Sequence, residues 1–223
     1  NDIQTHVEIT LEEAFAGVEK DVRVMTRVAC DTCHGTGSNS GAAGVETCPS
    51  CHGAGKVRAQ QGFFVVERAC PTCHGAGRVV KDPCKACRGE GTVEQERTIK
   101  VQIPAGVEDG TRIRLTGEGE AGGNGVPPGD LYVHVAVTEH SIFQRDGANV
   151  YCRVPLRMAQ AALGTEIEVP VIDGSRTIVK IPAGTQTGAH FRLRGKGFSV
   201  LRSSARGDMY IQVTVETPQV LTK

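Results

Sequence analysis

The stretch CDTCHGTG at residues 30–37 decides how this sequence is read, because three close copies of it follow. The copies read CPSCHGAG at 48–55, CPTCHGAG at 70–77 and CKACRGEG at 84–91. Each copy has the pattern Cys-x-x-Cys-x-Gly-x-Gly, so eight of the nine cysteines fall into four matching motifs. One such pair is a weak signal, whereas four with the same glycine tail indicate a shared structural task.

The spacing of these pairs is typical of tetrahedral zinc sites. A Cys-x-x-Cys loop places two thiolates on one side of a Zn²⁺ ion, and four thiolates close its coordination shell. The glycines permit tight loops whose backbone amides point at the sulfurs. We therefore expect two closed, structural zinc sites per chain. Their ligands are Cys30, Cys33, Cys48, Cys51, Cys70, Cys73, Cys84 and Cys87.

Three other uses of paired cysteines compete with zinc. A disulfide framework is typical of small secreted chains, and thioredoxin-like redox chemistry needs one Cys-x-x-Cys at the start of a helix. The first three copies also match the Cys-x-x-Cys-His motif of c-type haem attachment, but the fourth has Arg88 in place of histidine. The repeated glycine tail favours zinc over all three, and thiol–disulfide exchange stays as a minor hypothesis.

An internal repeat brackets the cysteines. VQIPAGVEDGTRIRLTGEG at 101–119 returns as VKIPAGTQTGAHFRLRGKG at 179–197, an offset of 78 residues. Leu11–Ala14 resembles Leu156–Ala159 at an offset of 145, so the first copy holds about 67 additional residues. All eight paired cysteines lie within them. The repeat predicts two related modules, with a metal-binding unit inserted in the first.

Insertion between two strands requires the ends of the inserted unit to lie close together, which favours a nested pairing of the cysteines. The outer pairs would then form one site and the inner pairs the other. The outer set is Cys30, Cys33, Cys84 and Cys87, and the inner set is Cys48, Cys51, Cys70 and Cys73. Sequential pairing along the chain is the alternative, and spacing alone leaves both open.

The two modules are predicted to be mainly β. Apolar residues alternate over 3–9 and 22–28, as in half-buried strands, and further strands are expected at 97–103, 112–115, 131–137 and 150–154. Thr10 opens a capping box that predicts a short helix ending at Gly17, and 155–163 is expected to be its counterpart.

These elements predict two tandem β-sandwich-like modules with an extended, two-zinc cysteine-rich hairpin domain inserted in the first. The first module comprises residues 1–29 and 92–139, the inserted domain 30–91, and the second module 140–223. Cys152 stands alone in an expected strand and is predicted to be a small buried apolar residue.

Charge and motif content limit the classes of function. Lys and Arg number 25 and Asp and Glu also number 25, which argues against a mainly electrostatic nucleic-acid binder. No apolar run approaches the ~20 residues of a membrane span. No nucleophile elbow, Walker loop or His-Glu-x-x-His motif occurs, so we expect no enzyme. A zinc-ribbon nucleic-acid module remains the alternative, with seven basic against five acidic residues over 30–91.

Taken together, the inserted motifs and the two modules closely resemble the DnaJ family of J-domain co-chaperones, in its zinc-binding class. The resemblance covers essentially the whole chain. Supporting stretches are QGFF at 61–64, KDPC at 81–84, GEAG at 119–122, PGDL at 128–131 and LRGKG at 193–197. It implies a cytoplasmic co-chaperone that binds unfolded polypeptides and passes them to a DnaK-type ATP-dependent chaperone. No His-Pro-Asp motif occurs, so this chain alone is not expected to stimulate that partner's ATPase.

The same resemblance implies roles for particular residues. A client segment is expected to lie along a strand of the first module and to place an apolar side chain in a pocket. That pocket comprises Ile3, Val22, Val24, Leu115 and Phe143. The alternative for each of these residues is that it packs in the hydrophobic core and contacts no client. The family pattern agrees with nested zinc pairing and links the inner site to work with the DnaK-type partner. It also implies a homodimer of the full-length protein through a C-terminal segment that is absent or cut short here.

Overall fold

The computed structural model describes residues 1–61, 64–122 and 126–219, and the architecture is mainly β, as predicted. Part of the QGFF stretch and the last residues of the predicted second module lie outside the described residues. In the first half of the chain the elements are β1 (Ile3–Ile9), α1 (Leu11–Ala16), β2 (Val18–Ala29), the 3-10 turn η1 (Gly41–Gly44), β3 (Val45–Thr47), β4 (Lys56–Gln61), β5 (Phe64–Ala69), β6 (Arg78–Val80) and β7 (Thr92–Ile103).

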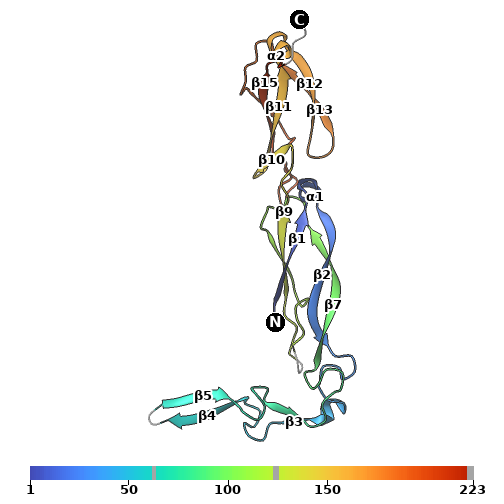
Figure 1. Ribbon diagram of the computed structural model, residues 1–223, viewed down its shortest axis with the longest axis vertical. Coiled ribbons are helices and arrows are strands. Elements are labelled where there is room, and N and C mark those ends of the chain that lie inside the picture. The colour runs from blue at the N-terminus through green and yellow to red at the C-terminus, as the bar shows by residue number, and fades with distance from the viewer. Residues whose placement is uncertain (62–63, 123–125, 220–223) are drawn as a thin grey trace. The chain divides into compact units, whose positions relative to one another are not determined.

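The second half of the chain continues from β8 to β15 (Figure 1). Its elements are β8 (Arg112–Leu115), β9 (Leu131–Val137), β10 (Phe143–Asp146), β11 (Asn149–Arg157), α2 (Met158–Leu163), β12 (Thr165–Pro170), β13 (Arg176–Ile181), β14 (His190–Leu193) and β15 (Met209–Glu216). No helix in the described ranges is long and apolar enough to cross a membrane.

The chain divides into two compact units. The first combines Asn1–Thr5, Arg23–Thr98 and Arg114–Tyr132, and the second combines His6–Val22, Ile99–Ile113 and Val133–Lys223. The described strands form sheets in the orders β1-β9-β8 and β10-β11-β15-β14, together with the two-stranded pairs β2-β7, β12-β13, β3-β6 and β4-β5. The predicted domain boundaries stay a prediction.

Within the first unit, the cysteine-rich segment is one nested hairpin. Its two halves pair in order, through the Ser38–Pro83 bridge, then β3 with β6, then β4 with β5. Val45 lies opposite Val80, and Lys56 lies opposite Ala69. This antiparallel pairing brings residues that are distant in sequence to the same level of the hairpin.

The internal repeat is reproduced in the hydrogen bonds of the two modules. Asp130 accepts a bond from the Gly117 amide at 2.9 Å, and Asp208 accepts the equivalent bond from Gly195 at 2.8 Å. The same carboxylates pair with Arg114 and Arg192, at 2.7 and 2.5 Å. These aspartates therefore hold turns, which explains their recurrence at the start of a strand.

The first helix follows its sequence signal closely. The Thr10 hydroxyl accepts a bond from the Glu13 amide at 3.2 Å, and the Glu13 carboxylate accepts one from the Thr10 amide at 3.0 Å. Gly17 ends the helix at φ +78°, and a Cβ there would lie 2.9 Å from the Ala105 nitrogen. The Pro-Ala-Gly turn is thus packed against the helix end, where only glycine fits.

The counterpart helix begins later than the sequence predicts. It comprises Met158–Leu163, whereas the predicted span begins at 155. Pro155 and Leu156 remain in β11 because they pair with Thr214 and Val215 of β15 in a parallel ladder. Tertiary strand pairing therefore outweighs the local helix signal. Strands β2 and β7 likewise extend beyond their predicted ends, beginning at Val18 and Thr92.

In the second unit, Arg145 joins β10 to the turn after β7. Its guanidinium donates to the carbonyls of Gly147 at 2.8 Å and Gly106 at 3.0 Å, and also to that of Val107. Its carbon lies 3.7 Å from the centre of the Phe198 ring. Burial lowers the pKa of this arginine, because part of its guanidinium is withdrawn from water.

We expect Arg145→Ala to destabilise the chain by about 3 kcal/mol, since it removes charged hydrogen bonds and a cation–π contact together. Urea unfolding followed by circular dichroism measures this effect. Arg202→Ala, in an exposed turn, is the control and should change stability by less than about 0.5 kcal/mol. Equal midpoints for the two variants would contradict the role given to Arg145.

Candidate metal centres

Each Cys-x-x-Cys motif folds into the same tight turn. The residue after the second cysteine has a left-handed backbone in all four copies, with φ between +49° and +54°. These residues are His34, His52, His74 and Arg88. The following glycines also have positive φ, from +70° to +98°. The three histidines are exposed, and the sequence pattern did not predict their left-handed conformation.

The turn aims a backbone donor at one sulfur in every copy. The second glycine of each motif donates its amide to the second cysteine's Sγ at 3.2–3.3 Å. Such bonds favour the ionised thiolate, which is the form that binds metal. The glycine tail therefore has the role that the sequence predicted.

The structure brings the eight paired cysteines into two groups, and the arrangement is nested. In each group the four sulfurs lie within 4.8 Å of one another. The outer group is Cys30, Cys33, Cys84 and Cys87, and the inner group is Cys48, Cys51, Cys70 and Cys73. Sequential pairing is not what the fold adopts.

The spacing of the sulfurs fits a tetrahedral zinc ion. Zn–S bonds of ~2.3 Å at tetrahedral angles place neighbouring sulfurs about 3.8 Å apart. The Cys33–Cys87 sulfurs lie 3.7 Å apart, as do those of Cys51 and Cys73. The Cys48–Cys70 distance is 3.8 Å. All eight cysteines are unbridged and buried, so a disulfide framework is not formed.

Reciprocal backbone bonds hold the two turns of each centre together. In the outer centre, Cys30 donates to the Gly91 carbonyl at 2.9 Å and Cys84 donates to Gly37 at 2.8 Å. The inner centre repeats this arrangement, from Cys48 to Gly77 at 3.0 Å and from Cys70 to Gly55 at 2.9 Å. Each centre is therefore a pair of turns related by local two-fold symmetry in its hydrogen bonds.

The glycines of paired turns also approach each other closely. A Cβ at Gly55 would lie 2.4 Å from the Gly75 carbonyl oxygen, and one at Gly77 would lie 2.5 Å from that of Gly53. In the outer centre, a Cβ at Gly37 would lie 2.4 Å from the Gly89 carbonyl oxygen. A Cβ at Gly91 would lie 2.5 Å from the Gly35 carbonyl oxygen. Backbone contact at this range excludes any side chain, so the glycine tail also serves the pairing of turns.

The thiols of one centre differ in acidity before an ion binds. Backbone hydrogen bonds, chiefly from Cys33, lower the pKa of Cys30 to about 7. The Cys73 amide is the main cause that lowers the pKa of Cys70 to about 6. Burial raises the pKa of Cys51 and of Cys87 to about 11. Metal binding must therefore displace protons from some thiols, while others are readily ionised.

The five predicted client-binding residues do not gather at one described cavity. Val22 and Val24 on β2 are only 6% and 7% exposed, so their side chains belong to the core. Ile3 on β1 and Leu115 on β8 are half-buried. Phe143 on β10 lines a cavity of about 550 Å³ whose lining contains none of the other four.

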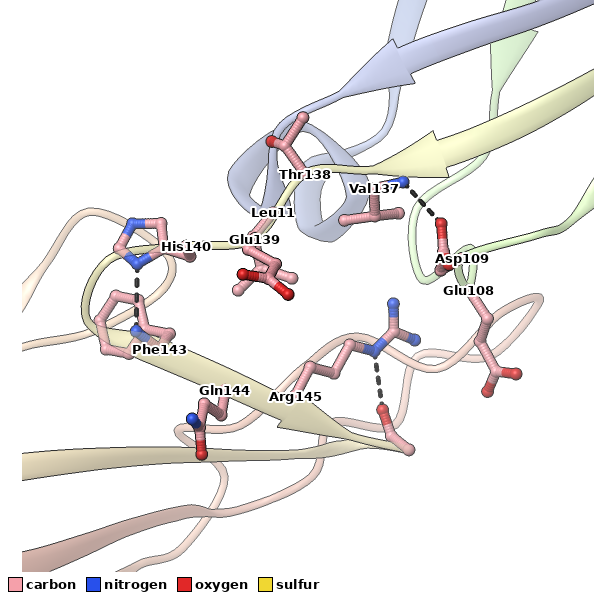
Figure 2. Close-up of a pocket in the computed structure, with 11 residues that line it drawn as sticks. Leu11, Glu108, Asp109, Val137, Thr138, Glu139, His140, Phe143, Gln144 and Arg145 are labelled. Atoms are coloured by element: carbon pink, nitrogen blue, oxygen red, sulfur yellow. Dashed lines mark hydrogen bonds between the residues drawn. The ribbon is translucent and has the colours of Figure 1, made fainter.

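Figure 2 shows the surroundings of Phe143 in this cavity. The imidazole of His140 is stacked on the Phe143 ring, with ring centres 4.9 Å apart. The Nδ1 of His140 accepts the amides of Ile142 and Phe143, so its Nε2 donates to Glu12 at 2.9 Å. Leu11 and Val137 add apolar lining, and Glu139 borders the space. Sequence reasoning missed His140, which carries no motif.

Two buried four-cysteine centres on a hairpin, set into a duplicated β scaffold, define the class of β proteins with cysteine-rich metal-binding sites. The DnaJ C-terminal domain family matches residues 3–218, and the chain belongs to this family. The resemblance drawn from the sequence is thereby confirmed.

Curated relatives named chaperone protein DnaJ match the full length of this chain. The one from Acetobacter pasteurianus is 88% identical over 223 residues, which is 100% of this chain and 59% of the relative. Those from Acidiphilium cryptum and Ruegeria pomeroyi are 72% and 59% identical over 222 residues, 100% of this chain and 58% of each relative. The chain thus spans less than two thirds of these relatives.

Proposed function

We propose that this chain is the client-binding and metal-binding part of a cytoplasmic DnaJ-type co-chaperone. It holds segments of unfolded polypeptides and passes them to a DnaK-type ATP-dependent chaperone. The observation that carries this proposal is the pair of four-cysteine centres on a chain that matches the DnaJ C-terminal domain family over 3–218. It has no enzymatic role in this proposal, and the longer protein acts as a homodimer.

Zinc is the metal that the donor set favours. Four thiolates in a closed tetrahedron leave no coordination position for water, so the ion stabilises the hairpin and does no chemistry on a substrate. Val93 packs against the outer centre, and Val57 and Val79 pack against the inner one, which keeps solvent from the sulfurs. Two Zn²⁺ per chain are proposed, and the inner centre serves the DnaK-type partner.

Edge strands supply the physical basis for binding unfolded chains. Among the described strands β2 pairs only with β7, so its other edge offers backbone groups that no strand pairs, apart from the Arg27 carbonyl, which accepts the Ala121 amide at 2.7 Å. An extended segment of any sequence can add to such an edge, while nearby apolar surface selects its side chains. Met25 on this strand is 65% exposed and provides adaptable apolar surface.

Phe143→Asp tests the proposed apolar pocket, and we expect it to weaken binding of a reduced, unfolded client protein by about tenfold, since a carboxylate replaces buried apolar surface. Fluorescence anisotropy with the labelled client measures the affinity. Phe143 is 6% exposed, so thermal unfolding must show that the variant folds. Leu115→Asp, at a half-buried position that does not line the Phe143 cavity, tests a second predicted client residue. Unchanged affinity in both folded variants would reject both residues as client contacts.

A further inference from the structure

We propose that the outer face of the sheet β10-β11-β15-β14 carries an anion-binding subsite for the carboxylate side chain of an extended polypeptide. The site is a cavity of about 430 Å³ on this face. Its polar lining includes Arg153, Gln212, His190 and Tyr151, and Ile142 borders it. The cavity borders the one around Phe143 and shares His140 and Gln144 with it, but Arg153, Gln212 and His190 line this cavity alone.

Strand register places these donors side by side. Arg153 of β11 lies opposite Gln212 of β15, and Gln212 lies opposite His190 of β14. Successive residues of a strand point to opposite faces, and the neighbours Cys152 and Ile211 are buried in the core. A guanidinium, an amide and an imidazole therefore form one row across the solvent face.

The adjoining row is held in place by its own contacts. The Tyr151 and Tyr210 rings are stacked, with centres 5.2 Å apart and planes 14° apart. Arg192 lies beside Tyr210 in the register but is paired with Asp208, so its charge is compensated. The stacked rings thus form a rigid wall next to the first row.

The cavity has an unbalanced positive charge. None of the described residues that line it is acidic. Within the described chain, Arg153 and His190 take part in no ion pair. His140 also lines the cavity, but its ring nitrogens already bond to Glu12 and to two backbone amides, so it has no free nitrogen for an anion. Arg153 is therefore the charge that is available to an anion.

The first module shows that the fold does not require these residues. By the offsets of the internal repeat, Glu8 takes the place of Arg153, His134 that of Gln212, and Arg112 that of His190. The corresponding row thus contains a carboxylate where the second module has a guanidinium. The two copies thus distribute charge differently along this row, and the shared fold does not require a guanidinium at the place of Arg153.

An acidic polypeptide fits this face better than a nucleic acid does. Ile142, at the rim of the cavity, is 49% exposed and suits an apolar side chain next to the acidic one. A nucleic-acid backbone would need several cations spaced along it, and the chain as a whole has no basic excess. Alternating side chains of an extended peptide can meet Arg153 and Ile142 together.

The test uses the metal-loaded chain and three fluorescein-labelled peptides of alternating sequence: Glu with Val, Gln with Val, and Lys with Val. Anisotropy should show the Glu peptide binding about fivefold more tightly than the Gln peptide, and the Lys peptide more weakly than either. Arg153→Ala should remove that fivefold preference, and Arg153→Glu should reverse it. Because Arg153 is exposed, neither change should disturb folding.

Arg68→Ala is the matched control, since it removes the same charge from the exposed face of β5. It should leave the preference for Glu unchanged, whereas a similar loss would show that net charge alone is responsible and would overturn the site. Equal binding of Glu and Gln peptides would overturn it as well. An oligonucleotide that competes with the Glu peptide at equal concentration would reject the polypeptide in favour of nucleic acid. Leu115→Asp, at a client-binding candidate that does not line this cavity, should not affect this assay, so failure of one proposal is distinguishable from failure of the other.

Discussion

Replacing Cys84 with serine is expected to remove one of the two proposed zinc ions and to unfold the base of the cysteine-rich hairpin. Four thiolates complete each centre, and a hydroxyl is a poor substitute for a buried thiolate beside the other three. Binding of a structural zinc contributes about 10–16 kcal/mol, which exceeds the stability of most domains. The loss of one ligand therefore affects the centre as a whole.

Metal analysis by mass spectrometry measures the result directly. Cys84→Ser should lower the zinc content from two ions per chain to one, because the inner centre has its own four ligands. Cys152→Ser is the matched control, since that buried thiol belongs to neither group and should leave both ions in place. Two ions retained by Cys84→Ser would show that Cys84 is not a ligand. Two ions lost would show that the centres fold together.

Gly55→Ala should have the next largest effect, although it changes no ligand. The added Cβ would lie 2.4 Å from the Gly75 carbonyl oxygen, and φ at this residue is +70°. The clash and the left-handed backbone together cost about 3 kcal/mol or more, which forces the two inner turns apart. We expect zinc to leave the inner centre at a lower chelator concentration, while the outer centre is unchanged.

Gly41→Ala separates the clash from the backbone strain. Gly41 lies in the same hairpin with φ +62°, but a Cβ added to it would meet no atom within 4 Å. This variant should cost only about 1–2 kcal/mol and should release zinc as the unchanged chain does. Competition with a chromophoric chelator follows the release, and identical curves for the two variants would contradict the packing role of Gly55.

The sequence was sufficient to predict much of this protein. The four motifs predicted the metal ligands by type, because thiolates at Cys-x-x-Cys spacing suit few other purposes in glycine-rich turns. The alternation of apolar residues predicted β1, β8 and β9 with the bounds that the structure has. The capping box at Thr10 predicted α1, since a helix start is specified by residues within one turn.

Local sequence patterns do not predict the backbone structure correctly where contacts with residues distant in the sequence determine it. Pro155 and Leu156 extend β11 only because β15 lies beside them, and no local pattern contains that partner. The left-handed backbone at His34 and its equivalents follows from the turn around the sulfurs rather than from histidine itself. The predicted client residues stay a prediction, and the structure shows only that Val22 and Val24 are buried and that Phe143 lines a cavity.

Local chemistry therefore determined which residues are suited to bind metal and which segments are strands. Tertiary structure alone decided that the cysteines pair in nested order, through reciprocal bonds such as Cys30 to Gly91, since the spacing permits either order. It alone brought Arg153, Gln212 and His190 into one row, because that row depends on the register of three strands. The physical reason is that ligand type and strand pattern depend on neighbours in sequence, whereas pairing and register depend on contacts between segments far apart in the chain.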